Sequence, residues 1–402
     1  MASDRYTYIK LPGEEKRFFC IQQNPLGLAW LLFFKKNTLL PRIEFNGLAK
    51  SRFSANDTLR GYYSFSRANV RKIIAFLKYK FHFRDYYSSV NLPFYGQVCV
   101  LVNKGYKIFD LRRKVAIKVY RDDVDVSTIK AELERLKKGS LFAFGPSIRK
   151  INITERFYEE DYVSGFLDNS PRPRNSQGLL EKFYSDVVPC LVSLLLHQPP
   201  KKINISDYLQ KMLSTLKIDN LLTENSNAGD IDYVLSFIHS MKERLQSEGN
   251  ISVLFVLTHG DFCPANMLST KEGLKLLDWE SATHRSALFD FYSYFFFRPL
   301  HQKLPVAELT QELNTGLSFY LSRLASISGE VLASVQLHEK TYRWLFYVER
   351  IWMLVERVKY DTKLNTQANI RRYIHVFNEY EELIKNYNKE TRVQSRINLQ
   401  VL

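Results

Sequence analysis

Three polar side chains at the borders of two apolar runs are of the types that phosphoryl transfer requires. Asp261 and Asn266 lie in the segment 258–266 (THGDFCPAN), and Asp278 follows in the segment 276–280 (LLDWE). In such chemistry one carboxylate orients a hydroxyl and accepts its proton, while a carboxamide and a second carboxylate hold magnesium on the nucleotide phosphates. Residues 258–280 are therefore the candidate catalytic loop.

The apolar runs predict the elements that position these side chains. Val253–Leu257 precedes the segment that contains Asp261 and Asn266. Leu274–Leu277 lies between that segment and Asp278. Short apolar runs bounded by polar turns are typical of buried strands. We therefore expect a strand, a tight loop and a second strand, with the polar residues at the loop and at the strand ends.

A lysine within an apolar strand marks a second candidate site upstream. The segments 97–102, 106–109 and 114–120 predict three consecutive strands joined by turns, and Lys118 lies inside the third. A helix is expected from an N-cap at Ser127 to about Lys138. Glu132 lies at the edge of the apolar face of that helix, where it could reach an inward-pointing Lys118.

A buried lysine requires such an acidic partner. Glu134 is an alternative partner, although its position lies further from the apolar face of the helix. The alternative for Lys118 itself is a solvated side chain at the end of a strand. The residues alone leave these alternatives open.

The order of these elements is that of the protein-kinase-like fold, and the motifs resemble its aminoglycoside phosphotransferase and choline kinase branch. The resemblance rests on His259-Gly260-Asp261 with Asn266, on Asp278-Trp279-Glu280, and on the segment 288–292 (LFDFY). This form looks most like the phosphotransferases often found among bacterial cell-surface polysaccharide genes. It covers about residues 96–360.

The resemblance implies a role for each matching residue. Asp261 would be the catalytic base, and Asn266 and Asp278 would bind Mg²⁺. Lys118 would contact the α- and β-phosphates of ATP and would be held by Glu132. A glycine-rich phosphate loop is not evident, because the first hairpin turn contains only Gly105.

Further residues match supporting positions of the family. The segment 160–165 (EDYVSG) matches its hinge, where the Asp161 carbonyl and the Val163 amide would bind adenine. Asp290 matches the aspartate that braces the catalytic loop. Glu280 could approach a second metal ion or form a local ion pair, and both alternatives stay open.

These observations predict an α+β protein with a two-lobe, protein-kinase-like fold. Residues 1–90 would form a basic N-terminal region of unclear fold, and residues 91–165 a β-rich lobe that ends in the hinge. Residues 166–402 would form a helical lobe that contains the catalytic loop. Within residues 1–90, the segment 26–34 fits a strand or a helix, and the segment 66–81 predicts a basic amphipathic helix.

The positive charge is concentrated near the N-terminus. Residues 1–120 contain 22 Lys and Arg against 7 Asp and Glu, which equals the net charge of +15 of the whole chain. This asymmetry suggests an acidic partner, such as nucleotide phosphates, an anionic membrane surface, or an anionic glycan or lipid-linked substrate. Nucleic acid is a further acidic partner, but no recognition motif in the sequence supports it. A solvated basic face is the alternative.

The scattered cysteines and the polar N-terminal residues indicate a cytoplasmic protein. Peripheral contact with the inner face of the membrane is compatible with this location. The four cysteines form neither a C-x-x-C pair nor a cluster with zinc spacing. No signal peptide is visible in the first residues. The expected thiols are therefore reduced.

The acceptor should lie near the C-terminal helices, where the segment 342–352 (YRWLFYVERIW) is rich in aromatic residues. Trp344 and Tyr347 could cage a quaternary ammonium, stack on a sugar, or belong to an apolar core. The neutral C-terminal part does not favour polycationic aminoglycosides. A saccharide or glycan precursor ranks first, choline or ethanolamine second and an aminoglycoside third. A scaffold without catalytic activity is the alternative of another class.

Overall fold

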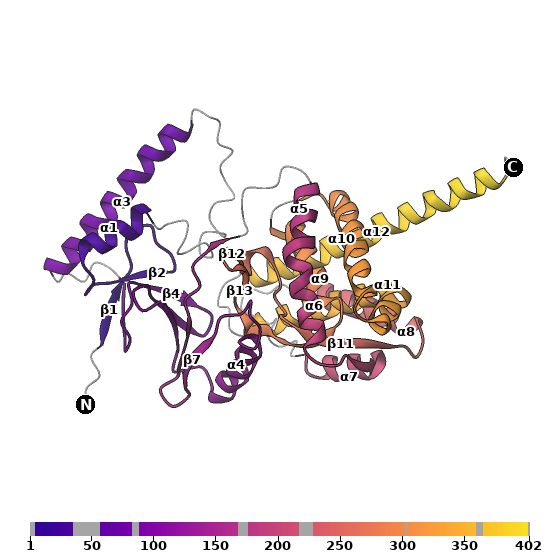
Figure 1. The fold of residues 1–402 in the computed structure, drawn as a ribbon, viewed down its shortest axis with the longest axis horizontal. Coiled ribbons are helices and arrows are strands. Elements are labelled where there is room, and N and C mark those ends of the chain that lie inside the picture. Colours follow the sequence, from indigo (N-terminus) through magenta and orange to yellow (C-terminus); the bar gives the residue numbers. More distant parts are fainter. Residues whose placement is uncertain are drawn as a thin grey trace. The chain divides into compact units, whose positions relative to one another are not determined.

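The computed structural model describes residues 5–34, 57–82, 88–167, 176–216, 228–301, 304–358 and 365–400. The chain divides into two compact units. The first contains Met1–Ser170 and Ala265–Glu280, and the second contains Pro171–Pro264 and Ser281–Leu402. The first unit is rich in strands and the second is mainly helical (Figure 1), which confirms the predicted α+β class.

An antiparallel sheet of eight strands forms the centre of the first unit, in the order β3-β1-β2-β4-β5-β6-β8-β7. The predicted run of three strands corresponds to β4 to β6. The strands are β1 (Tyr6–Ile9), β2 (Arg17–Cys20), β3 (Ser89–Leu92), β4 (Val98–Val102), β5 (Gly105–Asp110), β6 (Val115–Tyr120), β7 (Ile148–Asn152) and β8 (Phe157–Asp161).

Strand β6 is buried along its whole length, and its alternation sends Lys118 away from the main apolar cluster. Val115, Ile117 and Val119 pack into a cluster with residues of β1, β2, β4, β5 and β8. Successive side chains of a strand point to opposite faces. Lys118 and Tyr120 therefore lie on the other face of the sheet.

The helix that follows β6 is α4 (Val126–Gly139), and it begins slightly earlier than the sequence predicts. Its N-cap is Asp125 rather than Ser127, because the Asp125 carboxylate accepts a hydrogen bond of 2.7 Å from the Thr128 amide. An aspartate is among the best N-cap residues. The buried face of α4 includes Ile129, Glu132 and Leu133.

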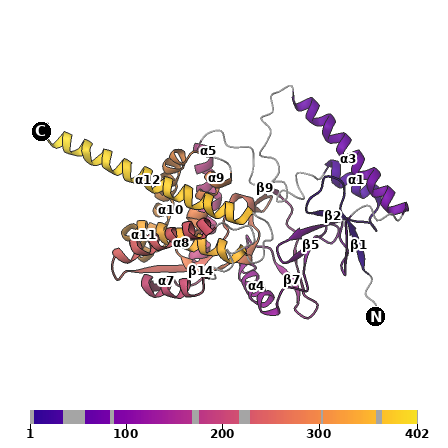
Figure 2. The same ribbon diagram turned by 180° about the vertical axis from the view of Figure 1, so that it is seen from behind.

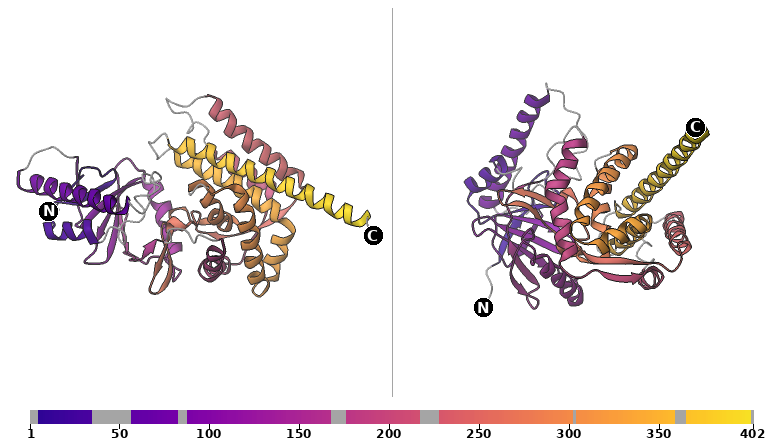
Figure 3. Two further views of the ribbon diagram at one scale, coloured as in Figure 1. Left: turned by 90° about the horizontal axis from the view of Figure 1, so that it is seen from above. Right: turned by 45° about the vertical axis from the view of Figure 1, so that its right-hand side comes forward.

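Strands and helices from the first ninety residues belong to the same compact unit. Strands β1 to β3 join the large sheet, and helices α1 (Pro25–Phe34) and α3 (Asp57–His82) lie side by side (Figure 3). The segment 26–34 is thus helical, and the helix predicted over 66–81 begins already at Asp57. Within this region, residues 1–4, 35–56 and 83–87 lie outside the described part of the chain.

Helix α3 presents apolar side chains on two sides. Phe76 is fully buried in a cluster with residues of α1, β1, β2 and β4. Val70, Ile74 and Phe81 are instead 46%, 47% and 66% exposed. The broad apolar face predicted for this helix is therefore only partly buried.

A small sheet carries the second half of the candidate catalytic loop. Strands β12 (Met267–Thr270) and β13 (Gly273–Leu276) form a hairpin, and β9 (Phe166–Leu167) pairs with β12. The hairpin places Met267 opposite Leu276. The residues just outside these strands are consequently neighbours.

The second unit contains a sheet in the order β10-β11-β14, with β11 in the middle. Helices make up most of this unit (Figure 2). Within the described residues, no helix combines the length and apolar composition needed to cross a membrane. The strands are β10 (Lys201–Asn204), β11 (Ser252–Thr258) and β14 (Thr283–Ser286). The helices are α5 (Ser176–Lys182), α6 (Val188–Leu196), α7 (Ile205–Ser214), α8 (Ala228–Ser247), α9 (Phe289–His301), α10 (Val306–Ala325), α11 (Gly329–Val358) and α12 (Asn365–Gln400).

Candidate active site

The ion pair predicted between Lys118 and Glu132 is present in the first unit. Lys118 Nζ lies 2.5 Å from Glu132 Oε1, and the two side chains are 1% and 0% exposed. The Tyr120 hydroxyl also donates to Glu132 Oε1, at 2.8 Å. Glu132, and not Glu134, is therefore the partner of Lys118 on α4.

A second carboxylate, that of Glu280, also contacts Lys118 Nζ. Burial disfavours the charged form of Lys118, but Glu280 and Glu132 outweigh this effect and hold its pKa above the ordinary value. The Glu280 side chain is 25% exposed, whereas Glu132 is fully buried. The structure thus shows Glu280 in an ion pair with Lys118, and its approach to a second metal ion stays a prediction.

Lys104 shares the buried carboxylate of Glu132 and was not singled out from the sequence. Its Nζ lies 2.9 Å from Glu132 Oε2, and its side chain is 14% exposed. Burial raises the pKa of Glu132, but Lys118 and Lys104 together hold it below the ordinary value. The sequence does not predict this contact, because it depends on how α4, which carries Glu132, packs against the hairpin that carries Lys104.

Trp279 anchors the segment that carries Glu280 to the end of α4. Its indole is 1% exposed and stacks on Phe142, with 5.4 Å between the ring centroids. A Cβ at Gly139 would lie 2.3 Å from the same indole, so only glycine allows this close packing. Arg135 Nη1 donates to the Glu280 carbonyl at 2.9 Å. These contacts fix the backbone beside Lys118.

Asn266 and Asp278, the predicted magnesium ligands, flank the β12–β13 hairpin. The Leu277 amide donates to the Asn266 carbonyl at 2.8 Å, and Asp278 is the residue that follows Leu277. Asn266 is 2% exposed. Asp278 has a φ of 69°, a left-handed conformation that aspartate tolerates better than most residues.

The predicted hinge follows strand β8. The Asp161 amide donates to the Ser147 carbonyl at 2.9 Å, and its carboxylate pairs with Arg149 at 2.6 Å. Val163 is two residues further, outside the strand. These contacts fix the backbone at Asp161, and the adenine contacts of Asp161 and Val163 stay a prediction.

Asp261, the predicted base, lies in the second unit, just after the central strand β11. Gly260 has a φ of 82°, and a Cβ there would lie 2.3 Å from the Ser281 carbonyl oxygen. Glycine is therefore required at this position. The Asp261 amide donates to His259 Nδ1 at 3.2 Å, so His259 supports the loop backbone.

Asp290 accepts hydrogen bonds from the backbone of the same loop. The amides of His259 and Gly260 donate to its carboxylate at 2.6 Å and 3.0 Å. Burial raises the pKa of Asp290 to about 6, although both amides act in the opposite direction. The contacts agree with the bracing position that the resemblance implies for Asp290.

Arg350 of helix α11 contacts Asp261 directly, a relationship that the motif does not reveal. Arg350 Nη2 lies 3.2 Å from Asp261 Oδ1 and 2.9 Å from the Tyr373 hydroxyl. Arg350 is 8% exposed, and the Asp261 side chain is 20% exposed. The carboxylate thus has a fixed cationic neighbour.

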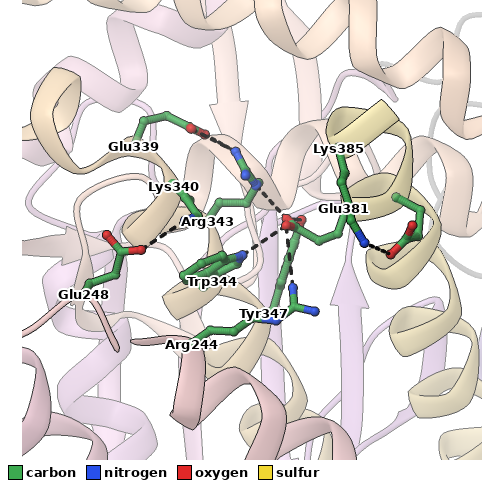
Figure 4. A network of polar contacts seen from close by, with 10 residues as sticks. Arg244, Glu248, Glu339, Lys340, Arg343, Trp344, Tyr347, Glu381 and Lys385 are labelled. Atoms are coloured by element: carbon green, nitrogen blue, oxygen red, sulfur yellow. Dashed lines mark hydrogen bonds and ion pairs between the residues drawn. The ribbon is translucent and has the colours of Figure 1, made fainter. Parts of the chain in front are cut away.

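The aromatic segment 342–352 belongs largely to the core of the second unit. Trp344 is 5% and Tyr347 0% exposed, and both donate hydrogen bonds to Glu381, at 3.1 Å and 3.0 Å (Figure 4). Lys340 Nζ lies 4.3 Å and the Arg244 guanidinium 5.7 Å from the Trp344 ring. These contacts favour the core alternative over a cage for a ligand.

Solved structures with similar folds include several small-molecule kinases. Choline kinase LicA from Streptococcus pneumoniae is 19% identical, with a TM-score of 0.45, and the match covers 70% of this chain and 91% of that one. A choline kinase from Cryptosporidium parvum is 16% identical, with a TM-score of 0.49 and coverage of 71% and 88%. A thermostable mutant of aminoglycoside phosphotransferase APH(4)-Ia, in a ternary complex with ADP and hygromycin B, is 12% identical, with a TM-score of 0.43 and coverage of 69% and 92%. At these identities the similarity concerns the fold alone.

No curated protein sequence matches this chain. The phosphotransferase enzyme family matches residues 223–325. That segment contains the candidate residues Asp261, Asn266, Asp278 and Asp290. The match agrees with the chemistry of the residue types and confirms the predicted class of enzyme, a phosphotransferase.

Proposed function

We propose that the protein transfers a phosphoryl group from ATP to a hydroxyl of a small molecule in a Mg²⁺-dependent reaction. The observation that carries this proposal is the buried Lys118, whose ammonium contacts the carboxylates of Glu132 and Glu280. A fully buried lysine is costly unless it is paired. An ammonium maintained in this way suits the binding of nucleotide phosphates.

On the nucleotide side, Lys118 binds phosphate oxygens while Glu132 fixes its position. The Asp161 carbonyl and the Val163 amide hydrogen-bond adenine. Asp161 is suited to this role because its backbone is tied to Ser147. In this arrangement Lys118 of β6 binds the phosphates, and the residues at the end of β8 bind the adenine.

Asn266 and Asp278 would hold Mg²⁺, and the donor set fits this ion. Both residues offer oxygen atoms, which a hard cation prefers, and a backbone hydrogen bond ties Asn266 to Leu277, the residue before Asp278. Among the described residues, no group of three His, Cys, Asp or Glu could enclose a metal ion. Magnesium commonly uses one or two protein ligands together with phosphates and water. When bound, it would neutralise charge on the phosphates.

On the acceptor side, Asp261 orients the hydroxyl and accepts its proton. His259 and Asp290 hold the loop backbone through the hydrogen bonds described above. Arg350 fixes one oxygen of the carboxylate. His259, Asp290 and Arg350 are therefore positioning residues for Asp261. Positioning of the reacting groups accounts for much of the rate enhancement in phosphoryl transfer.

The acceptor that we propose is a saccharide or glycan precursor. Arg350 places a positive charge beside Asp261, which disfavours cationic acceptors such as choline, ethanolamine or an aminoglycoside. The aromatic rings expected to cage a quaternary ammonium are buried and already contact Lys340 and Arg244. The motif resemblance to phosphotransferases of polysaccharide gene clusters supports the same acceptor class.

The first test measures nucleotide binding and turnover by the purified protein. We expect MgATP to raise the melting temperature, and Asp261→Asn to abolish phosphate transfer while it leaves the fold and this thermal shift intact. ATP consumption should be screened with neutral and acidic saccharides, choline, ethanolamine and aminoglycosides. Full activity of Asp261→Asn would refute the assignment of the base. No thermal shift at millimolar MgATP would favour the alternative of a scaffold without activity.

We also propose that the N-terminal part brings the enzyme to an anionic membrane surface. Val70, Ile74 and Phe81 form an exposed apolar stripe on α3, and the neighbouring Arg71 and Lys78 are exposed as well. Membrane-surface helices typically combine an apolar face with a polar face that is rich in basic side chains. Enzyme activity in the cytoplasm is compatible with such peripheral contact.

Liposome flotation tests this contact. The wild type should float with phosphatidylglycerol vesicles at low salt, and the triple substitution of Val70, Ile74 and Phe81 by serine should abolish flotation. Leu337→Ser is a matched control, because Leu337 is 76% exposed in the second unit. Binding that is independent of anionic lipid and salt would contradict the proposal.

A further inference from the structure

The hairpin that would cover the nucleotide phosphates has a lysine where kinases use a run of glycines. Strands β4 and β5 are joined by Asn103 and Lys104, and Val102 pairs with Gly105. Glycine-rich loops hold phosphates with backbone amides. A two-residue turn with one adjacent glycine offers few such amides, so another group must supply the positive field.

The hairpin is held firmly against strand β6. A Cβ at Gly105 would lie 2.0 Å from the Val119 carbonyl oxygen, so only glycine allows this approach. The Arg121 amide donates to the Lys104 carbonyl at 2.9 Å. Lys104 itself has a φ of 66°. The left-handed residue at the turn is thus fixed beside the strand that carries Lys118.

Lys104 and Lys118 contact the two oxygens of one carboxylate. Lys104 Nζ lies 2.9 Å from Glu132 Oε2, and Lys118 Nζ lies 2.5 Å from Glu132 Oε1. Two ammonium groups so close together require further negative charge. In this structure Glu280 supplies it through Lys118.

We propose that Lys104 is a second phosphate-binding residue, which acts beside Lys118 in place of a glycine-rich loop. This inference rests on the proposed function. Glu132 sets the spacing of the two ammonium groups, and the three donors of an ammonium allow it to contact a carboxylate and a phosphate oxygen together. Both lysines can therefore bind phosphate oxygens without leaving Glu132. The more exposed Glu280 is the anion that the phosphates replace.

The test compares nucleotides that differ in their phosphates. Lys104→Asn removes the charge and keeps a residue that tolerates the left-handed turn. We expect calorimetry to show affinity for ATP and ADP lowered about tenfold or more, as for the loss of one charge-assisted hydrogen bond. Adenosine should bind as it does to the wild type. Lys104→Arg should restore a large part of the affinity.

Lys137→Ala is the matched control, since Lys137 pairs with Glu134 on the same helix that carries Glu132 and is 54% exposed. It should leave all affinities unchanged. If the wild type binds ATP and Lys104→Asn binds it equally well, the inference is wrong and the proposed function stands. Equal loss of adenosine and ATP affinity would show a structural role only and would also overturn it. If the wild type binds no nucleotide, the proposed function fails first.

Discussion

The Arg350 guanidinium donates a hydrogen bond to the Asp261 carboxylate, with 3.2 Å between Nη2 and Oδ1. The same nitrogen contacts the Tyr373 hydroxyl at 2.9 Å, so a residue of α12 helps to fix the arginine. One oxygen of the carboxylate is thereby held in place. The other oxygen is the one that we expect to receive the proton of the acceptor.

Replacement of Arg350 should therefore lower kcat and leave nucleotide binding unchanged. We expect Arg350→Ala to reduce kcat about 10- to 100-fold, because the base loses its fixed orientation. Arg350→Lys keeps the charge but lacks the second nitrogen, Nη1, that contacts the Gly260 carbonyl at 3.4 Å, so it should rescue only part of the rate. Steady-state kinetics with saturating MgATP and each acceptor measure this effect.

Tyr373→Phe is the control for this prediction, since it removes only the hydroxyl that holds Arg350. Its effect on kcat should be a few-fold at most. Denaturant unfolding of each variant separates loss of activity from loss of the fold. Wild-type kcat in Arg350→Ala would show that this ion pair has no part in catalysis.

Glu280 occupies a contact of Lys118 that the phosphates would use. Glu280→Gln should consequently bind ADP more tightly than the wild type in the absence of Mg²⁺, by about two- to tenfold, because a competing anion is lost. Calorimetric titrations with and without Mg²⁺ provide the measurement. Weaker binding that occurs only with Mg²⁺ would instead identify Glu280 as a metal ligand.

Asp278 combines an unusual backbone conformation with its predicted role as a metal ligand. Asp278→Asn should keep the fold, because asparagine tolerates a φ of 69° as well as aspartate does. It should raise the Mg²⁺ concentration needed for half-maximal activity by about tenfold or more, since a neutral amide replaces a charged ligand. Asp278→Ala, which lacks this tolerance, should also be less stable. An unchanged Mg²⁺ requirement in Asp278→Asn would argue against the assignment.

The apolar pattern of the helix at residues 127–138 indicated that Glu132 could reach Lys118, but it left Glu134 as an alternative. The family resemblance implied the pair Lys118–Glu132, and the structure confirms their contact. The run 253–257 likewise indicated the strand that precedes Asp261. Such local patterns are reliable because they depend on neighbouring residues.

Contacts made by tertiary packing could not be predicted in the same way. Lys104 lies in the turn between β4 and β5 and contacts Glu132 of α4. Arg350 contacts Asp261, which is 89 residues away in the sequence. The segment 26–34 is too short and too uniformly apolar for periodicity to distinguish a helix from a strand. Its helical form follows from packing against Phe76 and the sheet.

Asp290 should make stability depend on pH. Its pKa is raised to about 6, against an ordinary value of 3.8, because burial disfavours its charged form. The folded state therefore binds this proton more strongly than the unfolded state. The resulting stabilisation is fully present below pH 3.8 and is lost as the pH rises through about 6. It amounts to about 3 kcal/mol at most.

Asp290→Asn isolates this contribution, since it removes the titrating group and keeps an oxygen that can accept from one of the two backbone amides. Urea unfolding between pH 4 and 7 should show that the free energy of unfolding of the wild type, minus that of Asp290→Asn, falls as the pH rises. Asp232→Asn, at an exposed position of helix α8 in the same unit, should show no such trend. A difference between wild type and Asp290→Asn that stays constant over this range would mean that Asp290 is ionised in the folded protein throughout. The brace would then consist of a charged carboxylate held by the amides of His259 and Gly260.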